Sequence, residues 1–183
     1  MIIASQKRKE NIAEYLLYMW QIEDLIRANN LEIDNIRKNI IDKFEIDPNH
    51  KHDLTEWYES LIDMMRREKV EQTGHLQLTK NVIIQLASLH QRLLNDPKYV
   101  NYSASFYKTL PYIVELRAKA GDNKQGEIET CFTALYGVLI LKLQGKEITA
   151  ETQSALTEIA HFLSILSYYF KLDDEDKLFN NEP

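Results

Sequence analysis

Apolar residues recur three and four positions apart along nearly the whole chain, and this spacing restricts the fold more than any other feature. Such spacing places apolar side chains on one face of an α-helix. No stretch alternates between apolar and polar residues for long enough to predict a strand. Five glycines and four prolines in 183 residues are also few for the turns of an all-β protein. The sequence therefore predicts an all-α fold.

Capping and helix-breaking residues divide this pattern into seven or eight helices. Asp53 and Glu56 have the spacing of a capping box and predict a helix that starts there. Pro111 lacks a backbone N–H and disfavours helical geometry at the preceding residue, so we expect a kink or break near Thr109. We expect a single compact bundle in which most neighbouring helices are antiparallel. The expected helices span about 6–28, 32–44, 53–69, 79–95, 97–108, 110–120, 127–144 and 150–171.

Length and composition favour one helical domain over residues 1–172. A chain of 183 residues, 44% of them hydrophobic, can bury one sizeable core. The last segment, 173–183, is acidic and lacks helical periodicity, so we expect a mobile tail. The longest apolar run, YGVLILKL, is much shorter than the roughly 18 residues of a membrane span, so none is predicted. The single cysteine, Cys131, fits a reducing cytoplasm.

Glu23 is the one acidic residue that the helical pattern places inside an apolar stripe, in the segment EYLLYMWQIEDLIR. A buried carboxylate without a partner would cost several kcal/mol or take up a proton. We therefore expect a partner, either a tyrosine hydroxyl, Arg27 one turn later or a basic residue of another helix. A buried acid of this kind can be catalytic, but no other catalytic group accompanies it in the sequence. We therefore interpret Glu23 as a structural pair or as an edge position whose carboxylate reaches solvent.

The sequence predicts no catalytic residue, cofactor or metal ligand. Glu158 and His161 have the Glu-x-x-His spacing of di-iron bundles, but such a bundle needs a second copy and further glutamates. His90 lies near an apolar helix face, where a hydrogen-bonded histidine at the edge of the core is the ordinary case. Phosphate-binding loops, dinucleotide-binding glycine motifs and nucleophile elbows do not occur in the sequence.

Positive charge gathers in the middle of a chain whose net charge is −6. Residues 66–119 contain nine Lys and Arg against four Asp and Glu, a net charge of +5. Lys108, Arg117 and Lys119 lie among tyrosines there, and cations beside aromatic rings can hold phosphates and stack bases. The alternative interpretation is structural, because Arg117 and Lys119 end a helix, where cations stabilise the helix dipole.

Five runs together resemble a family of bacterial proteins classed as a domain of unknown function. They are NIAEYLLYMWQIEDLIRA, WYESLIDMM, GHLQLTKNVI, YKTLPYIVELRAKAGD and EIETCFTALYGVLILKL, and they cover nearly the whole chain. The resemblance implies a bacterial, cytoplasmic, all-helical protein. It assigns no activity, ligand or functional residue.

Without a catalytic signal, we expect a non-catalytic helical domain that binds a protein partner or another copy of itself. The alternative is a binder of an anionic ligand or RNA, and its candidate binding residues are Lys108, Arg117, Lys119 and Glu23. An enzyme whose site residues are distant in sequence is a third hypothesis.

Overall fold

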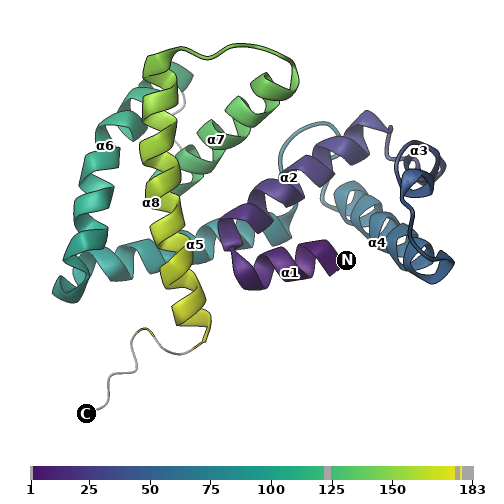
Figure 1. Ribbon diagram of the computed structural model, residues 1–183, viewed down its shortest axis with the longest axis horizontal. Coiled ribbons are helices and arrows are strands. Elements are labelled where there is room, and N and C mark those ends of the chain that lie inside the picture. The colour runs from purple at the N-terminus through teal and green to yellow at the C-terminus, as the bar shows by residue number, and fades with distance from the viewer. Residues whose placement is uncertain (1, 122–124, 176–177, 179–183) are drawn as a thin grey trace. The chain divides into compact units, whose positions relative to one another are not determined.

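The computed structural model describes residues 2–121, 125–175 and 178, and these residues form eight α-helices, two 3-10 helices and no strand (Figure 1). The prediction of an all-α fold with seven or eight helices is confirmed. None of the described helices is both long enough and apolar enough to cross a membrane. The helices are α1 (Ile2–Glu10), α2 (Ile12–Ala28), α3 (Ile33–Asn39), η1 (Ile41–Lys43), α4 (Pro48–Arg67), α5 (Gln77–Asn95), η2 (Pro97–Tyr99), α6 (Val100–Ala120), α7 (Glu127–Leu143) and α8 (Ala150–Asp174).

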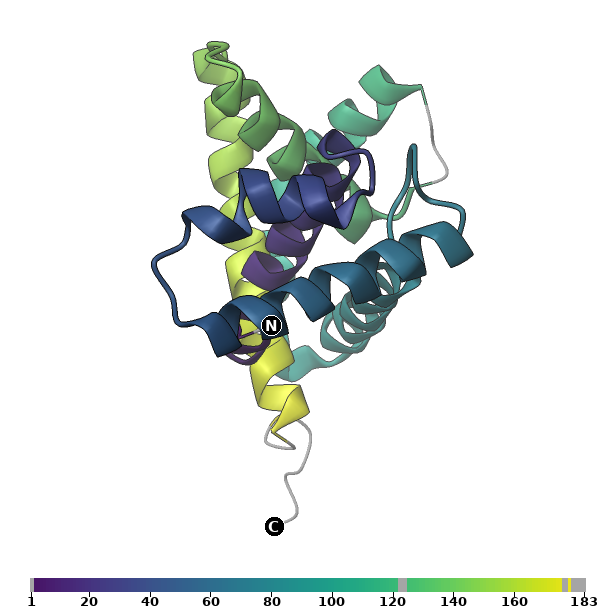
Figure 2. The same ribbon diagram turned by 90° about the vertical axis from the view of Figure 1, so that its right-hand side faces the viewer.

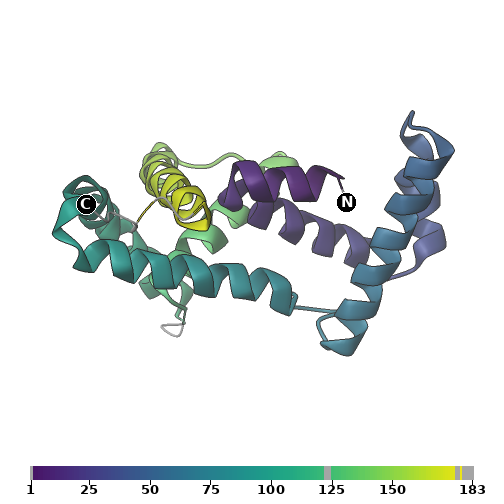
Figure 3. The same cartoon turned by 90° about the horizontal axis from the view of Figure 1, so that it is seen from below.

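Backbone contacts divide the chain into two compact units. The first contains α1, α2 from Glu14 onward, α3, η1, α4 and the start of α5 up to Asn81. The second contains Asn11–Ala13 and the chain from Val82 onward. The boundary falls inside α5, a continuous helix that Figure 3 shows along its length. The single domain over 1–172 stays a prediction, and most of the tail predicted at 173–183 lies outside the described residues.

In the first unit, the chain leaves α3, passes through η1 and turns back into α4, which lies against α3 (Figure 2). Helix α4 begins at Pro48 because the Asp47 carboxylate accepts the backbone N–H groups of Asn49 and His50, at 3.0 and 3.1 Å. The predicted start at Asp53 is therefore wrong. The single helix predicted at 6–28 is also wrong, because this part of the chain forms two helices, α1 and α2. The Asn11 side chain between them accepts the Ala13 N–H at 3.0 Å and caps the start of α2.

In the second unit, α6, α7 and α8 contact one another, and α6 and α8 lie side by side in opposite directions (Figure 1). Helix α6 is continuous from Val100 to Ala120 with Pro111 inside it, so a break near Thr109 and two separate helices at 97–108 and 110–120 are wrong, whereas the alternative of a kink stays a prediction. Thr109 and Ile113 are fully buried on either side of the exposed Pro111, and this packing favours an unbroken helix. The buried core residues of these three helices include Tyr102, Phe106, Ile113, Ile128, Cys131, Phe132, Ile159, Phe162 and Leu166.

Several predicted helix ends are confirmed. The side chain of Asp96 accepts the Lys98 N–H, and Pro97 occupies the first position of η2. Thr149 caps α8 by accepting the Thr152 N–H at 3.1 Å. Gly121 and Gly145 follow α6 and α7 with φ of 66° and 70°, the left-handed conformation that favours glycine after a helix.

Candidate functional site

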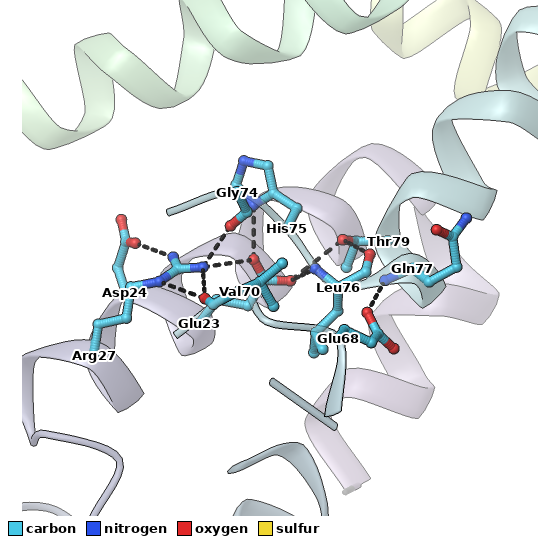
Figure 4. A network of polar contacts seen from close by, with 10 residues as sticks. All are labelled: Glu23, Asp24, Arg27, Glu68, Val70, Gly74, His75, Leu76, Gln77 and Thr79. Carbon is cyan, nitrogen blue, oxygen red and sulfur yellow. Dashed lines mark hydrogen bonds and ion pairs between the residues drawn. The ribbon is translucent and has the colours of Figure 1, made fainter. Parts of the chain in front are cut away.

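Glu23 is fully buried in the first unit, and protein groups surround its carboxylate (Figure 4). Its Oε2 lies 2.7 Å from His75 Nδ1, and its Oε1 accepts the Leu76 N–H at 3.2 Å. The Thr79 hydroxyl lies 3.3 Å from Oε1 and 2.8 Å from Leu76 O. The expected pairing of Glu23 is confirmed. The principal partners are a histidine and the beginning of α5, whereas Arg27 Nη2 is 4.0 Å from Oε2.

Arg27 connects α2 to the segment that precedes α5. Its Nη1 lies 2.7 Å from Asp24 Oδ1, and its Nε and Nη2 donate to Val70 O at 3.3 and 3.0 Å. Nη2 also donates to Gly74 O. Gly74 has a φ of 85°, which a residue with a side chain adopts only with strain. One guanidinium therefore holds both ends of the Val70–Gly74 turn against α2.

Two carboxylates receive the first backbone N–H groups at the start of α5. Glu23 accepts from Leu76, and Glu68 Oε2 accepts from Gln77 at 2.6 Å. A helix leaves its first N–H groups without partners inside the helix, and its dipole favours negative charge at this end. Trp20 stacks on the His75 ring with centroids 4.1 Å apart. Because both Glu23 oxygens are used inside the unit, this network fastens α2 to α5 and presents no free carboxylate oxygen to a ligand.

A hollow of about 580 Å³ between η1 and α4 carries side chains of both charges. Arg37, Lys51 and His52 face it, as do Asp42, Glu56 and Glu59. His52 Nε2 lies 3.3 Å from Glu56 Oε1. This mixture gives the hollow no strong preference for an anion or a cation. Among the described residues, no three His, Cys, Asp or Glu side chains gather as metal ligands.

The three basic candidates all lie on α6, but they do not share one face. Arg117 is nine residues after Lys108, which places it about 180° around the helix. Lys108 Nζ is paired with Glu158 Oε1 of α8 at 2.9 Å, and Lys119 Nζ with Glu115 Oε1 at 2.6 Å. The hydrogen bond to Glu115 raises the pKa of Lys119. Two of the three cations are thus already paired with carboxylates of the same unit.

An apolar stripe covers the outer side of α6 and remains in solvent. Val100, Tyr107 and Val114 are 66, 63 and 57% exposed. The smaller residues that alternate with them, Ala104, Pro111 and Ala118, are exposed as well. The spacing alternates between four and three residues, which is the spacing of a coiled-coil seam. The buried side chains Tyr102, Thr109 and Ile113 lie on the other side of the helix. We call this set the α6 stripe: Val100, Ala104, Tyr107, Pro111, Val114 and Ala118.

The α6 stripe is absent from the sequence-based prediction, because Pro111 divides the expected helix there. The seam is visible only when residues 100–118 are taken as one helix, since Pro111 is itself a member. The heptad spacing could have revealed the stripe, but the spacing cannot show which of the two apolar faces of α6 enters the core.

His90 is a buried histidine in the second unit. It is 1% exposed, and its Nδ1 lies 2.6 Å from Tyr102 Oη. Its ring packs edge to face against Phe106 and Phe162, with centroids 4.6 and 5.8 Å away. Burial lowers the pKa of His90 to about 4 and raises the pKa of Tyr102. His90 is therefore a neutral core histidine, more deeply buried than the expected position at the core edge.

The helices and the α6 stripe define an all-α protein with an apolar helix face in solvent. The chain belongs to the family described as Domain of unknown function (DUF4924), whose model matches residues 1–177. No curated protein and no solved structure matches the chain. The resemblance to a family of unknown function is confirmed, whereas bacterial origin and a cytoplasmic location stay predictions.

Proposed function

We propose that this protein is a non-catalytic interaction module that binds protein through the α6 stripe. The observation that carries the proposal is the exposure of Val100, Tyr107 and Val114 along one helical seam. Exposed apolar residues scattered singly are ordinary, but a contiguous apolar face on a protein surface is typical of an interaction site. A partner helix placed along this seam would remove all six side chains from water and could interdigitate with them.

The charges beside the stripe support protein binding more than binding of nucleic acid. Lys108 and Lys119 lie on one flank of the stripe, and each is already paired with a glutamate. Contacts to phosphate would have to compete with these pairs, and binding through phosphates needs several free cations. The RNA and anionic-ligand alternative and the enzyme hypothesis are less well supported by the described contacts. A cytoplasmic location is part of the proposal and is supported by the single, buried Cys131.

Site-specific photo-crosslinking in the cells that produce the protein tests the proposal. A photo-reactive phenylalanine derivative replaces Tyr107 in one variant and Tyr168 in the control. Tyr168 is 61% exposed, similar to Tyr107, but it lies on α8 and is not part of the α6 stripe. Helix α8 packs against the buried side of α6, where its Phe162 contacts Phe106. We expect crosslinks to protein from position 107 at least tenfold above those from position 168. Equal yields from the two positions would overturn the proposal.

A further inference from the structure

We infer that the α6 stripe binds the α6 stripe of a second copy of this chain, with the two helices antiparallel and a two-fold axis near Thr109. The inference rests on the proposed function and names the partner. It follows from the order of large and small side chains along the stripe. That order is large, small, large, small, large, small from Val100 to Ala118.

Antiparallel pairing about Thr109 places every large side chain of one copy opposite a small one of the other. Val100 faces the partner's Ala118, Val114 faces the partner's Ala104, and Tyr107 faces the partner's Pro111. All three pairs are equidistant from Thr109 in sequence, so a single two-fold axis generates all of them. A two-fold interface requires this self-complementarity, because the same surface is used twice. Large residues opposite small ones also allow two helix surfaces to interdigitate.

Parallel pairing of the same stripe is much less favourable. It would place each tyrosine against a tyrosine and each valine against a valine, while alanines would face alanines across a gap. Unfilled space and crowded contacts both lower the stability of a packed interface. The antiparallel arrangement also places opposite ends of the two helix dipoles side by side.

The charges next to the stripe are compatible with a second copy. In the antiparallel arrangement, Lys108 lies near the partner's Lys108, close to the axis. Each Lys108 is paired with Glu158 of its own chain at 2.9 Å, so the repulsion between the two cations is reduced. On the other flank, Leu110 lies near the partner's Leu110 and adds an apolar contact. Glu115 and Lys119 form their own pair one turn apart.

The length of the stripe indicates a weak dimer. The nineteen residues from Val100 to Ala118 extend over about 27 Å at a rise of 1.5 Å per residue. One helix pair of this length buries on the order of 1,000 Å² in total, below the roughly 1,200 Å² at which stable interfaces begin. We therefore expect dissociation in the micromolar range, with a monomer–dimer equilibrium that follows protein concentration.

Disulfide formation between variants that each carry one introduced cysteine tests the inference. Val100→Cys and Ala118→Cys are made in the full-length chain, one with a mass tag, and are mixed and mildly oxidised at about 50 μM. The native Cys131 is fully buried and burial raises its pKa to about 12, so wild-type protein serves as the blank. Tyr168→Cys, at a similarly exposed tyrosine on α8, measures random collision.

We expect the mixed pair to crosslink at least tenfold above the Tyr168→Cys control, and neither variant to exceed that control alone. Efficient crosslinking of Val100→Cys with itself would overturn the antiparallel arrangement. Crosslinking of the mixed pair no greater than the control, with a monomeric mass by light scattering up to about 200 μM, would overturn the second copy as partner. In that case, photo-crosslinks from position 107 to a different protein would leave the proposed function standing, and their absence would refute both.

Discussion

Acidification destabilises the second unit through His90, because this histidine is buried in a neutral state. Burial lowers its pKa to about 4 in the folded protein, whereas an exposed histidine in the unfolded chain has a pKa of about 6.5. The unfolded chain therefore binds more protons between these two values. The contribution of neutral His90 to the free energy of unfolding is fully present above about pH 6.5, and it is lost as the pH falls toward 4.

The size of the effect follows from the two pKa values. Proton linkage gives a loss of about 2 kcal/mol between pH 7 and pH 5, and about 3 kcal/mol by pH 4. Domains are stable by only about 5–15 kcal/mol, so this loss is readily measured. The titratable neighbours do not obscure it, because burial raises the pKa values of both Tyr102 and Cys131 and keeps them neutral over this range.

Urea unfolding followed by circular dichroism, repeated from pH 7 to pH 4.5, measures the effect. His90→Gln is the matched variant, because glutamine keeps a similar size and a polar atom for Tyr102 but does not titrate. We expect wild type to lose about 2 kcal/mol more than His90→Gln between pH 7 and pH 5. Parallel stability curves, within about 0.5 kcal/mol, would refute the assignment of His90 as a buried neutral group.

Three further predictions concern the α6 stripe and the Glu23 network. Tyr107→Glu should weaken self-association at least tenfold in sedimentation velocity, because it brings two carboxylates near the two-fold axis, whereas Tyr168→Glu should change it less than twofold. Glu23→Gln should lower the free energy of unfolding in urea by about 1–2 kcal/mol, and Glu23→Leu by about 3 kcal/mol or more, because leucine leaves buried donors without an acceptor. Equal losses in the two variants would contradict the network. Arg27→Lys should speed amide hydrogen exchange in residues 70–76 at least fivefold, because lysine cannot bridge Val70 O and Gly74 O, and unchanged exchange would show that Arg27 does not hold this turn.

The site could be predicted only in part from the sequence. The helical pattern located Glu23 inside an apolar stripe, and burial of a carboxylate required a partner. The identity of that partner could not be predicted, because His75 and Leu76 are more than fifty residues away and nothing local to α2 specifies them. The basic candidates could be located in the sequence, but their charge partners on other helices could not be predicted. Glu158, which pairs with Lys108, becomes a neighbour only when α8 lies beside α6.

Sequence alone determined the helical class and many helix ends, because these depend on residues within one or two turns of each other. The caps at Asp96 and Thr149 and the left-handed Gly145 are examples. Tertiary structure decided that α6 continues through Pro111, since packing of Thr109 and Ile113 on both sides offsets the missing backbone hydrogen bond. It also decided which apolar face of α6 is buried. Local periodicity can show that a helix has two apolar faces, but contacts with α5, α7 and α8 select the one that leaves the α6 stripe in water.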